Sequence, residues 1–250
     1  MPSAEAFPLY YPPNARRAFE SDDITRRFAN VATLASGSRV LEHMAGRGTA
    51  SILLAREFGC EVLAADPDEA VVFALSERVK SLSLQDRISA RRLDHGHLGF
   101  SPGQFDAIVV QGRVPGRLEE CVQQYRPLLS TNGRLLVTYP AKVGRSPQQR
   151  ALDFWEMRLG EPTRYPREIL QAIESCGFEP EAVETLDDGA LAELYRGLEQ
   201  KIDGNPDAAV LREEVSLFRG ASNKASVTYA FAVARRKEPG EKPPASRDRG

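Results

Sequence analysis

Cysteine and histidine are both scarce in this sequence, with three of each among 250 residues. They are Cys60, Cys121, Cys176, His43, His95 and His97. The cysteines are far apart and lie in apolar stretches, and neither among themselves nor with the histidines do they show metal-ligand spacing. We therefore predict reduced thiols packed in the core, with neither a disulfide framework nor a metal site.

An excess of positive charge is also missing. Lysine and arginine total 33 against 35 aspartates and glutamates, a formal net charge of −2, so no basic field would gather phosphate backbones. No apolar run approaches the length of about 18 residues that indicates a membrane span, and residues 1–17 lack the apolar core of a secretory signal. These absences predict a soluble cytoplasmic protein without general nucleic-acid binding or membrane contact. They leave open whether it is a monomer or a homodimer.

What the sequence does have is a regular alternation of strand and helix patterns. Short apolar runs predict strands at 39–42, 61–66, 87–93, 105–110, 134–139, 181–185 and 225–234. Helical spacing predicts helices at 22–34, 49–58, 69–82, 118–129 and 166–176, and one or two helices within 189–218. Asp22 or Asp23 would cap the first helix and Asp68 the third. This order predicts an α/β fold: a doubly wound, seven-stranded, mostly parallel sheet with helices on both faces.

The predicted elements divide the chain into three parts. Residues 1–35 would form an N-terminal helical cap, and residues 36–235 the α/β domain, in which 189–218 is a helical insertion. The polar segment 236–250, rich in proline and glycine, is predicted to be a disordered tail.

Three acidic residues follow predicted strands: Glu42, Asp66 and Asp94. Ligands of an open α/β sheet bind outside the carboxyl ends of the strands. After the first strand, the loop 44–48 consists mostly of small residues that let the backbone approach a ligand closely. Asp66 follows Gly46 by 20 residues, the offset of a carboxylate that accepts ribose hydroxyls. Because a left-handed backbone is unfavourable for methionine, we expect regular dihedral angles at Met44.

Several segments resemble the motifs of class I methyltransferases, which use S-adenosylmethionine. VLEHMAGRGTASILLAREFGCEVLAADPDE is similar to motifs I and II, RRLDH to the acidic motif after strand three, FDAIVVQG to strand four, and NGRLLVTYP to strand five. PREILQAIESCGFEPEAVE and SVTYAFAVARR resemble the late helix–strand pair and the terminal antiparallel strand of small-molecule members. The resemblance covers about residues 35–235 and implies S-adenosylmethionine-dependent methyl transfer, with an antiparallel last strand.

The residues that the resemblance implies for cofactor binding lie in the first loop and at the ends of the next strands. They are Glu42, Met44, Ala45, Gly46, Gly48, Asp66, Pro67, Asp94, His95 and Gln111. Glu42 and the loop would hold the methionine end of S-adenosylmethionine, and Asp66 the ribose hydroxyls. Asp94 and His95 would border the adenine, and Gln111 would lie near the transferable methyl.

Aromatic residues in the N-terminal segment and after strand five are candidates for the wall of an acceptor pocket, with packing in the core as the alternative. They are Tyr10, Tyr11, Tyr139, Trp155 and Tyr165. Strand four ends in VVQG, without the Asn/Asp-Pro-Pro-Tyr/Phe pattern that the resemblance links to methylation of amino groups on bases and glutamine. A small-molecule acceptor is therefore favoured. No catalytic residue is assigned, because in-line displacement at a sulfonium depends mainly on alignment and exclusion of water.

Three other functions stay open. Similar loops usually carry glycine where this chain has Met44, which keeps open a non-catalytic protein that binds S-adenosylmethionine or a partner. Gly46-Arg47-Gly48-Thr49 also imitates part of a dinucleotide fingerprint, which keeps open a nicotinamide-dependent oxidoreductase. Nucleic-acid methylation is the third.

Overall fold

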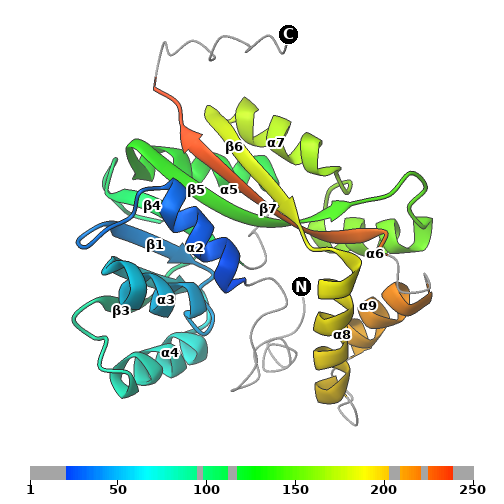
Figure 1. Ribbon diagram of the computed structural model, residues 1–250, viewed down its shortest axis with the longest axis horizontal. Helices are drawn as coiled ribbons and strands as arrows, with labels where there is room; N and C mark the ends of the chain where they lie inside the picture. Colours follow the sequence, from blue (N-terminus) through cyan, green and yellow to red (C-terminus); the bar gives the residue numbers. More distant parts are fainter. Residues whose placement is uncertain (1–20, 95–97, 112–116, 203–208, 221–224, 239–250) are drawn as a thin grey trace.

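The computed structural model describes residues 21–94, 98–111, 117–202, 209–220 and 225–238. Its strands form one seven-stranded sheet in the order β3-β2-β1-β4-β5-β7-β6 (Figure 1). The strands are β1 (Arg39–His43), β2 (Glu61–Asp66), β3 (Ile88–Arg92), β4 (Phe105–Val110), β5 (Leu129–Lys142), β6 (Phe178–Thr185) and β7 (Val227–Arg236). The first five pair in parallel, whereas β7 runs antiparallel to β5 and β6. The predicted fold, including its antiparallel last strand, is confirmed.

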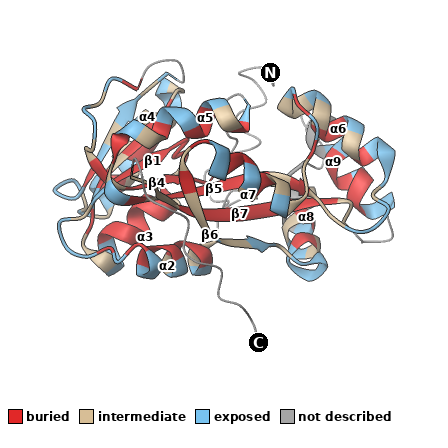
Figure 2. Cartoon of the chain, turned by 90° about the horizontal axis from the view of Figure 1, so that it is seen from above, coloured by how far each residue is buried: buried red, intermediate tan, exposed pale blue. Residues whose placement is uncertain are grey.

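Helices cover both faces of this sheet. The described helices are α2 (Asp22–Val31), α3 (Thr49–Phe58), α4 (Glu69–Ser81), α5 (Leu118–Tyr125), α6 (Gln149–Leu159), α7 (Pro166–Ser175), α8 (Asp188–Ile202) and α9 (Ala209–Gly220). Figure 2 shows the buried residues running along the sheet and the helix surfaces that face it. Each helix in the described ranges is too short or too polar to span a bilayer.

The core forms two clusters, one on each face of the sheet, because successive strand residues point to opposite faces. On β1, Val40 belongs to the cluster with α2, α3 and α4, and Leu41 to the cluster with α5 and α7. α6, α8 and α9 join the first cluster next to β7. Alternate residues are thus buried on both sides, as expected for a sheet between two helical layers.

The start of α2 differs from the prediction. Its N-cap is Ser21, whose hydroxyl accepts a hydrogen bond from the Ile24 amide (3.3 Å), so the capping role assigned to Asp22 or Asp23 is wrong. Both aspartates lie in the first turn, where negative charge is favourable. The helix ends at Val31, earlier than the predicted 34.

Strand β5 begins earlier than expected. The strand was predicted to start at residue 134, but it starts at Leu129 and includes Asn132-Gly133. The two residues form an irregularity, with Asn132 at φ +61°, between the Phe105–Leu129 and Ala107–Arg134 pairings. As a consequence, the preceding helix ends at Tyr125 and a short 3-10 turn replaces its last residues.

Three further boundaries are corrected or extended. Helix α6 was not predicted, and β7 continues to Arg236. The predicted insertion consists of two helices, α8 and α9, of which the first begins at Asp188. The predicted disordered tail beyond residue 238 and the cap residues 1–20 lie outside the described residues.

Candidate functional site

The loop between β1 and α3 has an unusual backbone. Met44, Gly46 and Gly48 have φ angles of +63°, +52° and +66°, so the expectation of regular dihedral angles at Met44 is wrong. Two backbone hydrogen bonds hold the loop in this shape: the Ala45 amide donates to Ala65 O (2.9 Å), and the Gly48 amide to Ala45 O (2.8 Å). The Met44 side chain is buried on the α5 face, and this burial offsets the cost of its left-handed backbone.

Gly48 has a packing role as well as a conformational one. It is the N-cap of α3 in the left-handed region. A Cβ atom at this position would lie 2.6 Å from Cδ1 of Leu75 in α4. A larger residue here would therefore require the Leu75 side chain to move, in addition to adopting the left-handed backbone.

The Glu42 side chain is completely buried at the end of β1. Its Oε2 accepts hydrogen bonds from the backbone amide (2.8 Å) and the hydroxyl of Ser51, in the first turns of α3. A buried carboxylate is costly unless it is hydrogen-bonded, and the start of a helix is a favourable place for its charge. Glu42 thus fixes α3 to β1 directly beneath the loop.

Asp66, at the end of β2, joins two loops. Its Oδ2 accepts from the Gly46 amide (2.9 Å), and its Oδ1 from the Asp68 amide (3.1 Å). The side chain is fully buried. Pro67 lies between the two contacts, and Asp68 caps α4 by accepting from the Ala70 amide (2.7 Å), as predicted. The acid and the first loop therefore form one rigid unit.

The remaining predicted cofactor residues lie at the ends of the neighbouring strands. Asp94 follows β3; its side chain is 77% exposed and faces Arg92, with a shortest N–O distance of 3.6 Å. The Leu93 amide donates to Asp66 O (3.1 Å), so this chain segment runs beside the end of β2. Gln111 is buried after β4 and hydrogen-bonds the start of α2. His95 lies outside the described residues.

This site was compared with known protein families. Residues 40–133 match the family model of a methyltransferase domain. This part of the chain is therefore similar to a methyltransferase domain. The match begins in β1 and includes the loop, Glu42, Asp66, Asp94 and Gln111. The resemblance stated from the sequence is thereby confirmed.

A curated relative matches less than half of the chain. An uncharacterized protein of Haemophilus influenzae is 27% identical over 114 residues, which are 44% of this chain and 45% of that protein. The chain therefore matches less than half the length of this relative.

Solved structures share the fold of the methyltransferase domain at low sequence identity. Phosphoethanolamine N-methyltransferase 2 of Haemonchus contortus, in complex with phosphomonomethylethanolamine and S-adenosylhomocysteine, has a TM-score of 0.74 at 16% identity, covering 94% of this chain and 57% of its own. Geranyl diphosphate C-methyltransferase of Streptomyces coelicolor A3(2), in complex with Mg2+, geranyl diphosphate and S-adenosyl-L-homocysteine, has 0.67 at 16%, covering 86% and 78%. The [4+2]-cyclase SpnF has 0.68 at 18%, covering 87% and 81%.

Among the residues that the structure describes, the aromatic candidates for a substrate wall do not all lie on one face of the sheet. Tyr139 is buried on the α5 face and Trp155 on the opposite face, where it contacts the Tyr229 ring edge-on at 5.8 Å. Tyr165 is half-buried at the start of α7, with Lys142 Nζ 4.7 Å from its ring centre. Tyr10 and Tyr11 lie outside the described residues. Core packing thus accounts for Tyr139 and Trp155.

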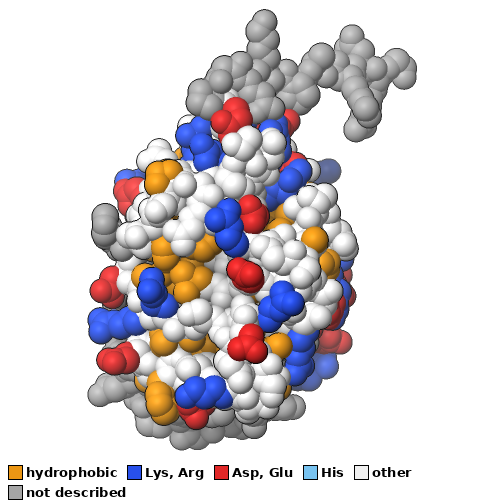
Figure 3. All heavy atoms as spheres, turned by 90° about the vertical axis from the view of Figure 1, so that its left-hand side faces the viewer, with side chains coloured by type: hydrophobic (Ala, Val, Ile, Leu, Met, Phe, Trp, Pro, Cys, Tyr) orange, Lys and Arg blue, Asp and Glu red, His pale blue; other side chains and the backbone are white. Residues whose placement is uncertain are grey.

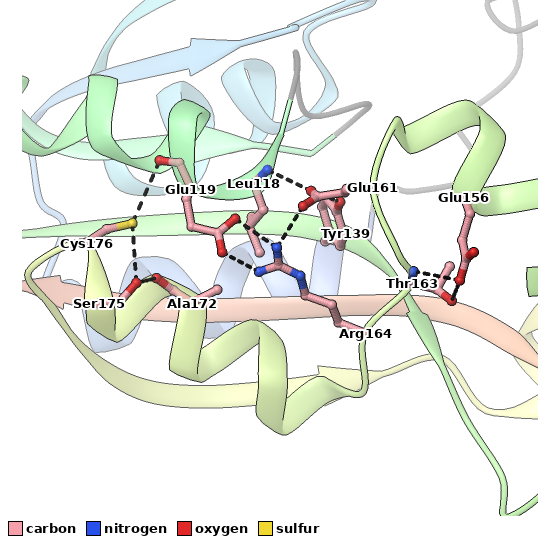
Figure 4. Close-up of polar contacts among 10 residues, drawn as sticks. All are labelled: Leu118, Glu119, Tyr139, Glu156, Glu161, Thr163, Arg164, Ala172, Ser175 and Cys176. Carbon is pink, nitrogen blue, oxygen red and sulfur yellow. Dashed lines mark hydrogen bonds and ion pairs between the residues drawn. The ribbon is translucent and has the colours of Figure 1, made fainter.

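A buried polar network was missed from the sequence (Figure 4). Glu161 is completely buried; its Oε1 accepts from the Tyr139 hydroxyl (2.5 Å) and the Leu118 amide (2.9 Å). Its Oε2 accepts from Arg164 (2.7 Å), which also forms a bidentate pair with Glu119 (2.7 and 3.0 Å). Arg164 lowers the pKa of Glu119, whereas burial and the hydrogen bond to Glu161 raise the pKa of Tyr139.

The network fixes the start of α5, the helix that follows the carboxyl end of β4 in the chain. No local pattern signals it, because Tyr139 and Glu161 meet only through tertiary packing. His43, next to Glu42, is similarly fixed: its Nδ1 lies 2.6 Å from the Tyr125 hydroxyl of α5. Within the described residues, no three Cys, His, Asp or Glu side chains are grouped to hold a metal ion.

Proposed function

We propose that this protein transfers a methyl group from S-adenosylmethionine to a small-molecule acceptor. The observation that carries the proposal is the hydrogen bond from the Gly46 amide to Asp66 Oδ2 (2.9 Å), which joins the first loop to the acid after β2 at the carboxyl edge of the sheet. This edge is where a ligand with a ribose and a polar chain would bind. The methyltransferase family match favours this cofactor over a nicotinamide.

The chemistry of the site fits S-adenosylmethionine. A carboxylate such as that of Asp66 is an acceptor of the kind that ribose hydroxyls need. Ala45, Gly46 and Gly48 carry little or no side chain, so a ligand can approach their backbone. Pro67, Asp94 and His95 would border the rest of the nucleoside. When bound, the cofactor supplies an electrophilic methyl and its own leaving group; the residues of the chain bind and orient it.

The proposal of a small acceptor rests on two observations. Strand β4 continues into Gln111 in place of an Asn/Asp-Pro-Pro-Tyr/Phe segment. In addition, acidic and basic side chains are interspersed on the face shown in Figure 3, without a one-signed patch for a polyanion. The proposed cap (residues 1–35) and the insertion that contains α8 and α9 would shape the acceptor pocket.

The test is calorimetric titration with S-adenosylmethionine and S-adenosylhomocysteine. Asp66→Asn keeps the size of the side chain but removes its charge and places an amide against a backbone N–H. We expect binding to weaken by at least about tenfold, since a hydrogen bond to a charged group contributes roughly 1.5–3 kcal/mol. Asp68→Asn is the matched control: it makes the same change two residues away, and asparagine still caps α4.

Equal affinity of the two variants, or no saturable binding by the unsubstituted protein, would contradict the proposal. A protein that binds both ligands is then screened for turnover with radiolabelled methyl donor and small amines, alcohols and acids. One second function has a specific observation behind it: Met44 occupies a left-handed position that similar loops give to glycine. Cofactor binding without turnover across the panel would favour such a non-catalytic protein.

A further inference from the structure

The side-chain amide of Gln111 closes a ring of hydrogen bonds with the start of α2. Its Oε1 accepts from the Ser21 amide (3.2 Å), and its Nε2 donates to the Thr25 hydroxyl (2.6 Å). The same hydroxyl donates to Ser21 O (2.8 Å). Both Gln111 and Thr25 are almost fully buried. The oxygen and the nitrogen of the amide thus both bond to the first turn of α2.

The ring lies at the edge of the sheet where ligands bind. Gln111 directly follows Val110, the last residue of β4, so it stands at the carboxyl end of a central strand. From there α2 packs against α3. The chain that follows α2 reaches the opposite edge of the sheet, where the Gly37 amide donates to Gly59 O (3.1 Å) just before β2. The first turn of α2 is therefore the part of this helix nearest to the ligand edge.

A second, independent contact holds α2 in the middle of its length. Arg26 forms a bidentate pair with Glu57 of α3, with both N–O distances at 2.8 Å, and both side chains are exposed. This pair can be removed without touching the ring. A buried amide, in contrast, is costly unless both of its functions are bonded. An apolar residue of the same size would fill the space at Gln111 equally well. What the amide contributes is therefore its directional hydrogen bonds to α2.

We propose that Gln111 is a positioning residue: it holds the first turn of α2 against the carboxyl end of β4, so that the helix closes this side of the cofactor site. The proposal rests on the proposed function and deepens it. Sequence resemblance implies only that Gln111 lies near the transferable methyl, whereas in this proposal its side chain acts through α2. It requires that Thr25, which sequence resemblance does not place at the cofactor, affects cofactor retention as strongly as Gln111 does.

The experiment measures the release rate of S-adenosylhomocysteine by surface plasmon resonance. Gln111→Met and Thr25→Val keep side-chain size and break the ring from either side. Each is expected to speed release about tenfold, the factor corresponding to one hydrogen bond, and the double variant no further, since both break the same ring. Thr25→Ser restores the hydroxyl and should restore slow release. Arg26→Met, the control, loosens α2 without touching the ring and should stay close to the unsubstituted rate.

Each other result overturns the proposal in a recognisable way. Faster release in Gln111→Met alone would mean that Gln111 contacts the cofactor directly. Equal acceleration by Arg26→Met would mean that any loosening of α2 suffices. Unchanged release in both ring variants would mean that the ring serves folding only. If the unsubstituted protein binds no S-adenosylhomocysteine, the proposed function itself fails, which is distinct from binding that the ring variants leave unaltered.

Discussion

The left-handed backbone of Met44 predicts that a glycine variant is more stable than an alanine variant at this position, the reverse of the usual order. Met44→Ala and Met44→Gly both remove the buried thioether side chain, but only glycine relieves the left-handed conformation at φ +63°. The difference between the two variants therefore isolates the conformational cost of this loop position. At most sites alanine is the more stable of the pair, because glycine loses more backbone entropy on folding.

The expected magnitude follows from three contributions. Truncating a buried methionine costs about 2–5 kcal/mol, so both variants should be less stable than the unsubstituted protein. A left-handed residue with a Cβ atom costs about 1–2 kcal/mol, and the entropic disadvantage of glycine is about 0.5–1 kcal/mol. Met44→Gly should therefore exceed Met44→Ala in free energy of unfolding by about 1 kcal/mol.

Urea unfolding followed by circular dichroism measures this difference directly. The control pair is Glu77→Ala and Glu77→Gly, at an exposed position in the middle of α4. There the alanine variant should have the higher free energy of unfolding, by about 1 kcal/mol. If Met44→Ala were as stable as Met44→Gly, the strain argument would be wrong, and the loop would adopt this shape without cost.

Two further predictions concern buried carboxyl groups. Burial raises the pKa of Glu214, which accepts from two tyrosine hydroxyls, so ionisation of Glu214 removes stability as pH rises from its ordinary value of 4.5 through the raised one. Glu214→Gln keeps an acceptor and cannot ionise; its stability relative to the unsubstituted protein should rise with pH in urea titrations, and parallel curves would contradict this. Arg164→Met leaves the buried Glu161 charge uncompensated and should cost about 2–3 kcal/mol in thermal unfolding. Because Arg164 lowers the pKa of Glu119, this difference should shrink as pH falls through that lowered pKa, and a pH-independent difference would argue against the pairing.

Local patterns account for what the sequence predicts well. Ala107–Val110 is an unbroken apolar run, which suits a strand buried on both faces. Aspartate is a preferred helix N-cap residue, so Asp68 could be assigned that role before α4. Asp66 and the Gly46–Gly48 turn could be paired from spacing alone, because strand–loop–helix units repeat with similar lengths. These features depend on residues close together in the chain.

The missed features depend on residues that are distant in the chain. Gln111 and Thr25, 86 positions apart, form their bond only once α2 has packed on the sheet, and Glu161 is an ordinary polar residue until Tyr139 and Arg164 surround it. The left-handed angle at Met44 is a compromise between side-chain burial and backbone strain, which a propensity for single residues does not capture.

The place of β7 between β5 and β6 has a consequence for how the chain is made. β5 forms its antiparallel ladder with β7, from Arg134–Arg235 to Lys142–Val227, and both helices of the insertion are synthesised between these strands. During synthesis, the apolar edge of β5 therefore has no strand partner until residues 227–236 have emerged. An unpaired edge of this kind can pair with other chains, so the nascent protein should aggregate most readily when translation pauses within α8 or α9.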